Sequence, residues 1–290
     1  MMISGKAKAI SSVLKLTKFK DNIDFFEPRR SKKIKLPQAL YKSNIIETVQ
    51  IMGGSVHNIL PFAESTKQHV IFFHGGGYVL EPSRNNLVMI EKFIGLAKCM
   101  ISYVEYPLSP ESNVNETMEM VFEAYKAQIE KFPDHTFILM GDSAGGGLAL
   151  ALAIHIKMNR IKQPEKLILF SPWLDIALTN PDIALYEDRD FILSSETLRE
   201  VGKRYAYDVP LEDYRVSPIY GDLNNLGDIL VFYGSEEILK PDCEKLISKG
   251  GLKNTFVKGI EYEEMQHDWV VLPILEQDLA LGDVIDFLLL

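Results

Sequence analysis

Short apolar runs typical of β-strands alternate with longer helical patterns from about residue 45 to the C-terminus. The eight strand-like runs cover 46–51, 56–62, 70–73, 100–106, 136–141, 166–172, 228–234 and 254–262. The helical patterns cover about 86–98, 116–131, 144–159, 241–249 and 273–289. This alternation is typical of βαβ units, in which helices cover both faces of a mostly parallel sheet. The sequence therefore predicts an α/β fold with a mostly parallel eight-stranded sheet.

Two segments depart from this alternation. The first two strand-like runs are separated by Met-Gly-Gly-Ser at 52–55, whose glycines suit the tight turn of an antiparallel hairpin. After the sixth run, residues 175–218 combine helical and loop patterns with many charged and aromatic side chains. The aromatic residues are Tyr186, Phe191, Tyr205, Tyr207 and Tyr214. We interpret 175–218 as an insertion and a candidate lid, with its aromatic residues forming mainly its own core.

Charge is distributed unevenly along the chain. Residues 1–43 carry 11 Lys and Arg against 3 Asp and Glu, a net charge of +8, whereas the remaining residues carry 20 against 37, a net charge of −17. An acidic body repels nucleic-acid phosphates, so no nucleic-acid partner is expected. In the basic segment, Ile10, Val13, Leu14 and Thr17 fall at helical spacing, which favours an amphipathic helix docked on the acidic body. The alternative is a basic arm for an anionic membrane or a nucleic acid.

Three features of the sequence bear on where the protein resides. No stretch of about 18 apolar residues occurs, so no stable membrane insertion is expected. The first 20 residues contain scattered lysines and no continuous apolar core, which argues against a secretory signal. The two cysteines, Cys99 and Cys243, are too few for a disulfide framework. Together these features predict a cytoplasmic protein.

The pentapeptide Gly-Asp-Ser-Ala-Gly at 141–145 follows a strand-like run and opens a helical pattern. A nucleophilic serine at a sharp strand-to-helix turn needs small neighbours, because the backbone there is strained and closely packed. The N-terminus of the following helix favours negative charge that develops at the site. The motif therefore makes Ser143 a candidate nucleophile. A phosphate-binding turn is the alternative, but the Gly-Lys-Ser/Thr ending of such loops is absent.

A second glycine-rich motif, His-Gly-Gly-Gly at 74–77, follows the third strand-like run. Glycines leave backbone N–H groups uncovered by side chains, so these groups can converge on the oxygen of a tetrahedral intermediate. The alternative is a flexible loop with an incidental histidine. We interpret His74 as a residue that orients this loop through hydrogen bonds, and not as the general base.

Several motifs together carry a family resemblance: HGGGYV (74–79), EYPLSPE (105–111), GDSAGGGLAL (141–150), SPWLDI (171–176), SPIYGDL (217–223), GSEEIL (234–239) and QHDW (266–269). On these motifs the chain resembles the hormone-sensitive-lipase branch of the α/β-hydrolase fold, home of many bacterial carboxylesterases. The resemblance implies a helical cap made of an N-terminal segment (1–45) and the insertion (175–218). The catalytic domain would then comprise 46–174 and 219–290. The family's manner of dimerisation implies a homodimer paired through the last strand.

The catalytic base follows from the order of the triad in this fold, which is serine, then acid, then histidine. Two of the six histidines follow Ser143. His155 lies in the helical pattern directly after the serine. His267 lies in a loop between the last strand-like run and the last helix, and its neighbours fit the family's motif around the catalytic histidine. We therefore predict that His267 is the base.

The acid is less constrained by the sequence. The family has an Asp-Pro-Leu-like tripeptide after the penultimate strand, and here its place is taken by Glu-Ile-Leu at 237–239. The resemblance thus implies that Glu237 is the acid, since either carboxylate can hold the imidazole tautomer. Glu236 and Asp242 are the alternatives.

The implied reaction is hydrolysis of short- to medium-chain acyl esters through an acyl-enzyme. The N–H groups implied to hold the oxyanion are those of Gly76, Gly77 and Ala144, and Gly75 stays open as a donor or as support for the loop. Neither C-x-x-C nor H-E-x-x-H occurs, so no metal and no cofactor is expected. Two other functions remain open on this scaffold: a non-catalytic small-molecule binding protein, and a serine amidase or peptidase.

Overall fold

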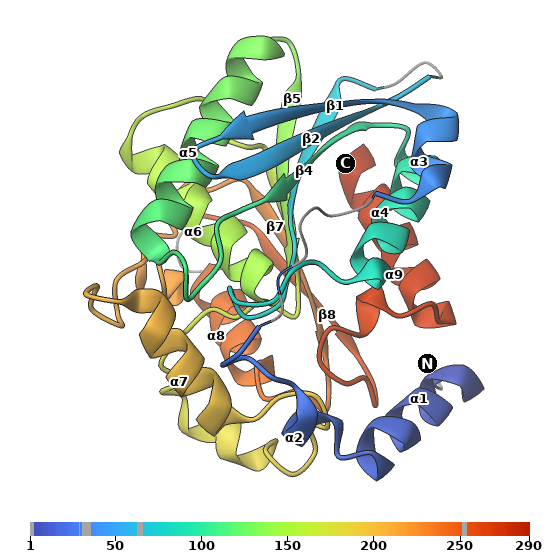
Figure 1. Cartoon of the computed structure of the whole chain (residues 1–290), viewed down its shortest axis with the longest axis vertical. Coiled ribbons are helices and arrows are strands. Elements are labelled where there is room, and N and C mark those ends of the chain that lie inside the picture. Colours follow the sequence, from blue (N-terminus) through green and yellow to red (C-terminus); the bar gives the residue numbers. More distant parts are fainter. Residues whose placement is uncertain (1–2, 29, 31–35, 63–65, 251–253) are drawn as a thin grey trace.

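The computed structural model describes residues 3–28, 30, 36–62, 66–250 and 254–290. A single eight-stranded sheet crosses the molecule in the order β1-β2-β4-β3-β5-β6-β7-β8 (Figure 1). Its strands are β1 (Asn44–Ile51), β2 (Gly54–Pro61), β3 (Gln68–Phe73), β4 (Met100–Glu105), β5 (Thr136–Asp142), β6 (Lys166–Phe170), β7 (Asp228–Gly234) and β8 (Val257–Tyr262). The β1–β2 hairpin and the β2–β4 pair are antiparallel, and all other pairs are parallel. The predicted fold class and strand number are confirmed.

Helices cover both faces of this sheet. One face carries α4 (Arg84–Ala97) and α9 (Leu275–Leu289), and the other carries α5 (Val114–Lys131), α6 (Ala144–Met158) and α8 (Lys240–Gly250) (Figure 1). Each face has its own apolar core. The central strand β3 explains the two cores, because successive side chains of a strand point to opposite faces. Ile71 and Phe73 lie in one core, and Val70 and Phe72 lie in the other.

Local sequence sets where the helices begin. The α4 helix starts with a capping box between Ser83 and Asn86, and α5 starts with one between Asn113 and Glu116. In each box the two side chains satisfy backbone N–H groups that the first helical turn leaves unpaired. The α6 helix is apolar on nearly every side, and 12 of its residues are buried. This burial fixes the direction of α6 firmly behind the turn at Ser143.

The insertion after β6 contains η1 (Pro181–Leu185), α7 (Ser195–Ala206) and η2 (Pro218–Tyr220). It touches the N-terminal segment, where Lys20 of α2 (Phe19–Asn22) donates to the Glu187 carbonyl at 2.7 Å. Tyr205 of α7 stacks on Tyr78, which follows the glycine-rich loop, with ring centroids 3.9 Å apart. Tyr205 is therefore buried against the body and not only within a core of the insertion, and Tyr207 is 72% exposed, so for these two residues the predicted core of the insertion is wrong. The division of the chain into cap and catalytic parts stays a prediction.

The predicted N-terminal helix exists as α1 (Gly5–Leu16), but the face assigned to it from the sequence is partly wrong. Its less exposed residues are Ile3, just before the helix, then Ala7, Ile10 and Leu14, a 3.6-residue spacing that forms one stripe. Val13, predicted to dock, is 57% exposed, and Thr17 is exposed as well. The apolar residues of α1 can be grouped into more than one stripe, and only contact with the body selects one.

The ends of the N-terminal segment are fixed on the face that carries α9. Ser4, which caps α1, donates from its backbone N–H and its hydroxyl to the Glu276 carboxylate at 2.5 and 2.9 Å. The short α3 (Gln38–Ser43) leads directly into β1 and buries Leu40 in the same core.

The 3-10 turn η3 (Trp269–Val271) follows the loop after β8. Within the described residues, each helix is too short or too polar to cross a membrane.

Candidate active site

Ser143 lies at the sharp turn between β5 and α6. Its backbone has φ 52° and ψ −119°, a conformation that a residue with a side chain rarely adopts. The turn is held by hydrogen bonds from the Ser143 N–H to the Phe170 carbonyl at 2.8 Å and from the Trp173 N–H to the Ser143 carbonyl at 2.9 Å. Two residues on, Gly145 packs so tightly that a Cβ there would lie 2.1 Å from the Phe73 carbonyl oxygen. The small residues of the motif are therefore a steric requirement of the turn.

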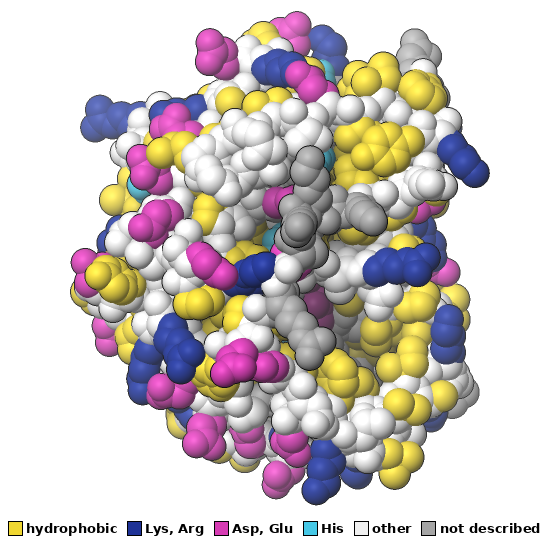
Figure 2. Space-filling model, viewed as in Figure 1, with side chains coloured by type: hydrophobic (Ala, Val, Ile, Leu, Met, Phe, Trp, Pro, Cys, Tyr) yellow, Lys and Arg dark blue, Asp and Glu magenta, His cyan; other side chains and the backbone are white. Residues whose placement is uncertain are grey.

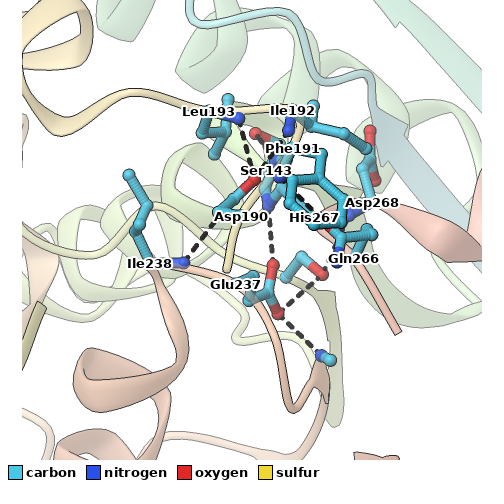
Figure 3. A network of polar contacts seen from close by, with 12 residues as sticks. Ser143, Asp190, Phe191, Ile192, Leu193, Glu237, Ile238, Gln266, His267 and Asp268 are labelled. Carbon is cyan, nitrogen blue, oxygen red and sulfur yellow. Dashed lines mark hydrogen bonds and ion pairs between the residues drawn. The ribbon is translucent and has the colours of Figure 1, made fainter. Parts of the chain in front are cut away.

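His267 reaches this serine from the loop between β8 and α9. Its Nε2 lies 2.9 Å from the Ser143 hydroxyl oxygen (Figure 3). Both side chains are almost completely buried, with Ser143 7% and His267 3% exposed. The two residues are 124 positions apart in the chain. A hydroxyl at this distance from an imidazole nitrogen is in reach of general-base catalysis.

Glu237 lies on the other side of the imidazole. Its Oε2 is 2.7 Å from His267 Nδ1, and its Oε1 accepts the Gly234 N–H at 2.8 Å and the Ser171 hydroxyl at 3.0 Å. These three contacts satisfy a carboxylate that has no exposed surface. Glu237 is thus the carboxylate that the structure brings to the histidine, since its two competitors point elsewhere. Glu236 pairs with Arg189, and Asp242 accepts from Asn180 at 3.1 Å.

The glycine-rich loop after β3 lies beside the serine. Gly76 and Gly77 have φ values of 107° and 63°, a region that residues with a Cβ rarely adopt. In the described part of the chain, the N–H groups of Gly76, Gly77 and Ala144 have no protein acceptor. The Gly75 N–H, in contrast, donates to Asp142 Oδ2 at 2.9 Å. Gly75 therefore supports the loop and is not available to an oxyanion.

His74 is also a structural part of this loop. Its Nδ1 contacts the Gly75 carbonyl at 2.6 Å, and its ring stacks on Tyr106 with centroids 4.5 Å apart. Burial lowers the pKa of His74 to about 4, although the hydrogen bond to the Gly75 carbonyl acts in the opposite direction. The imidazole is therefore neutral near pH 7 and donates its Nδ1–H to the loop. No metal-binding cluster of His, Cys, Asp and Glu occurs among the residues that the structure describes.

Comparison with known proteins identifies the family. A family model described as the α/β-hydrolase fold matches residues 70–271, more than half of the chain. The chain belongs to the α/β-hydrolase family.

The relatives of this α/β-hydrolase include proteins named as an esterase and as an acetyl-hydrolase. An esterase of Acinetobacter venetianus is 30% identical over 246 residues, which cover 83% of this chain and 81% of that protein. An acetyl-hydrolase of Streptomyces hygroscopicus is 29% identical over 201 residues, covering 69% and 67%. A solved esterase of the bacterial hormone-sensitive lipase family shares the fold, with a TM-score of 0.84 at 22% identity over 99% and 98% of the two chains. The predicted resemblance to this type of α/β-hydrolase is confirmed.

The insertion of this α/β-hydrolase contacts both loops that carry the histidine and its carboxylate, which the sequence did not predict (Figure 3). Asp190 Oδ2 accepts the N–H of Ile238, the residue after Glu237, at 3.0 Å. One residue on, the Phe191 N–H donates to the Gln266 side chain at 2.7 Å. Asp190 is fully buried, and burial raises its pKa to about 6 even though His267 and three backbone N–H groups favour its charged form. Residues 189–191 thus connect the insertion to the loop that carries Glu237 and to the loop that carries His267.

Proposed function

We propose that this chain is a serine carboxylesterase that hydrolyses short- to medium-chain acyl esters through Ser143, His267 and Glu237. The observation that carries the proposal is the continuous set of contacts from carboxylate to imidazole to hydroxyl, at 2.7 and 2.9 Å, in a buried site. The esterase and the acetyl-hydrolase among its relatives support the same chemistry.

The first half of the proposed reaction forms an acyl-enzyme. His267 Nε2 removes the proton from the Ser143 hydroxyl as the oxygen attacks the ester carbonyl. Glu237 accepts the Nδ1–H bond, so that Nε2 is free of a proton before the attack and the imidazolium is stabilised after it. The N–H groups of Gly76, Gly77 and Ala144 stabilise the negative charge on the carbonyl oxygen. The imidazolium then returns its proton to the leaving alkoxide, the bond to the alcohol breaks, and the alcohol departs, which leaves the acyl-enzyme and completes the first half.

The second half releases the acid. A water molecule, deprotonated by the same Nε2, then attacks the acyl-enzyme, and the intermediate collapses to carboxylic acid and free serine. Each proton taken by His267 is returned in the next step, so the enzyme ends the cycle unchanged.

The preference for short acyl groups rests on the family resemblance. In the structure, apolar side chains border the proposed oxyanion site. A Cβ at Gly77 would lie 3.0 Å from the Phe25 ring of the N-terminal segment and 3.7 Å from Val201 of α7.

The test is hydrolysis of p-nitrophenyl esters of increasing acyl length by the wild type and by Ser143→Ala, His267→Ala and Glu237→Ala. We expect activity to be highest at short chains. Loss of the serine or the histidine should lower kcat by a factor on the order of 10⁶, and loss of the glutamate by about 10⁴. Glu236→Gln and Asp242→Asn are the matched controls and should retain activity.

Other results would support other functions. If Asp242→Asn is inactive and Glu237→Ala is active, the acid is misassigned. If the wild type cleaves p-nitroanilides faster than esters, it is an amidase or peptidase. If no ester is cleaved and a fluorophosphonate does not label Ser143, the chain is a binding protein on this scaffold.

A further inference from the structure

Two aspartates flank the proposed catalytic residues directly in the sequence. Asp142 precedes Ser143 at the end of β5, and Asp268 follows His267 in the loop after β8. Their carboxyl groups lie close enough to interact directly. Two loops that lie more than 120 residues apart in the chain are therefore connected by a contact between two acids.

A count of hydrogen-bond partners shows what this contact requires. Asp142 Oδ2 accepts the Gly75 N–H at 2.9 Å and the Asn86 side-chain amide at 3.0 Å. The other oxygen, Asp142 Oδ1, is buried, as is Asp268 Oδ1, and neither has a donor among the described residues. An ionised carboxylate only accepts hydrogen bonds, so two ionised groups cannot bond to each other. A proton held between the two carboxyl groups removes this conflict, because a protonated carboxyl can donate to an ionised one.

The charges around the pair favour retention of that proton. Burial raises the pKa of Asp268 well above its usual range, and the negative charges of Asp142 and Glu237 raise it further. Burial also raises the pKa of Asp142, against the lowering effect of its N–H donors and of His267. The other titratable groups that face Asp142 are the phenols of Tyr103 and Tyr106 on the β4 side, which burial keeps neutral.

We propose that Asp142 and Asp268 share one proton, and that this shared proton holds the histidine loop against the nucleophile turn. The same pair fixes the glycine-rich loop, because Asp142 also accepts the Gly75 N–H. Asp142 and Asp268 are thus positioning residues for three segments of the active site, and neither needs to touch a substrate. This inference does not depend on which ester, if any, the enzyme cleaves.

The shared proton has a consequence for pH dependence. With one proton, the pair carries a single negative charge, and the electrostatic interaction of Asp142 with His267 favours that charge. When the proton leaves, two negative charges face each other in a buried site. Both folded-state pKa values lie above those of the unfolded chain, so the stability that the pair contributes is complete at low pH. It is lost as pH rises through the raised pKa.

The test compares the wild type with Asp268→Asn, whose amide N–H can donate to Asp142 permanently and cannot titrate. Urea unfolding of both proteins is followed between pH 5 and 9, without any activity assay. We expect the unfolding equilibrium constant of the wild type, relative to that of the variant, to rise tenfold per pH unit until the pair has lost its proton. The control is Asp134→Asn, because the Asp134 side chain is exposed. The ratio of the wild-type unfolding constant to that of this control should stay constant with pH.

A ratio that is independent of pH for Asp268→Asn would overturn the proposal. Infrared spectroscopy gives a second readout: the wild type near pH 7 should have the C=O stretching band of a buried neutral carboxyl that Asp268→Asn lacks. If Asp268→Asn does not fold, Asp268→Ser, which keeps a short donor, takes its place in both measurements. An identical band in variant and wild type would also overturn the proposal. A wild type that cleaves no ester but shows the tenfold rise would refute the proposed function and leave the shared proton standing.

Discussion

At the scale of single residues, the arrangement of the candidate site depends on side chains outside the proposed triad. The Ser171 hydroxyl donates to Glu237, and the Ser171 backbone itself is bent, with φ 43°. This serine orients the carboxylate that orients the imidazole. Its role is visible only in the structure, since 66 residues separate it from Glu237.

Replacement of Ser171 by alanine should therefore weaken the proposed activity without abolishing it. The variant removes one of two hydrogen bonds to Glu237 Oε1 and leaves the Gly234 N–H in place. A hydrogen bond to a charged group is worth about 1.5–3 kcal/mol, so we expect kcat to fall by about 10- to 100-fold. Ser171→Thr, which keeps the hydroxyl, is the control. A kcat for Ser171→Ala equal to that of the wild type would show that the orientation of Glu237 does not depend on this bond.

At the scale of elements, the insertion and the catalytic loops form one unit. Asp190 accepts the N–H groups of Ile192 and Leu193 within its own loop, at 2.8 Å each, and the N–H of Ile238 beyond β7. The same carboxylate therefore shapes the insertion and holds the loop that carries Glu237. Movement of the insertion would have to break this contact or carry that loop with it.

Replacement of Asp190 by asparagine tests how much this carboxylate contributes to stability. The amide offers one acceptor oxygen in place of two, so one set of N–H groups loses its partner, which costs about 1–3 kcal/mol of unfolding free energy. Because the folded-state pKa of Asp190 is raised to about 6, its contribution to stability is largest below about pH 4 and falls as pH rises to about 6. Thermal melts between pH 4 and 7 should therefore show a difference in Tm between wild type and variant. This difference should shrink as pH rises to about 6 and stay constant above that pH. A difference that grows with pH would contradict this sign.

At the scale of the whole molecule, the sequence predicted what depends on local pattern. The individual strands, the turn at Ser143 and the glycine loop after β3 are each encoded in a short stretch of sequence. The acid was harder, because Glu236, Glu237 and Asp242 share one short segment and only its path in space selects among them. The contacts of Asp190 with distant loops, like the docked face of α1, arise from packing between elements and leave no local pattern.

The surface and the sheet edge are further features that local sequence patterns do not determine. Among the described residues, acidic and basic side chains are interspersed over the face drawn in Figure 2. The sheet ends at β8, whose outer edge has no partner strand in the described part of the chain. The homodimer implied by the family resemblance would pair two copies at this edge. It stays a prediction.

A buried histidine at the centre of the sheet predicts that the whole molecule is sensitive to acid. His69 is fully buried on β3, contacts the Ser102 hydroxyl at 2.7 Å, and has a pKa lowered to about 3, first by burial and then by His135. A lowered folded-state pKa means that stability is complete above the unfolded pKa of about 6.5 and is lost as pH falls toward 3. Urea unfolding between pH 7 and 4 should show this loss for the wild type and a smaller one for His69→Gln, which cannot titrate. His135→Gln, at a more exposed site, should change the slope less, and equal slopes for His69→Gln and wild type would mean that protonation of His69 does not drive acid unfolding.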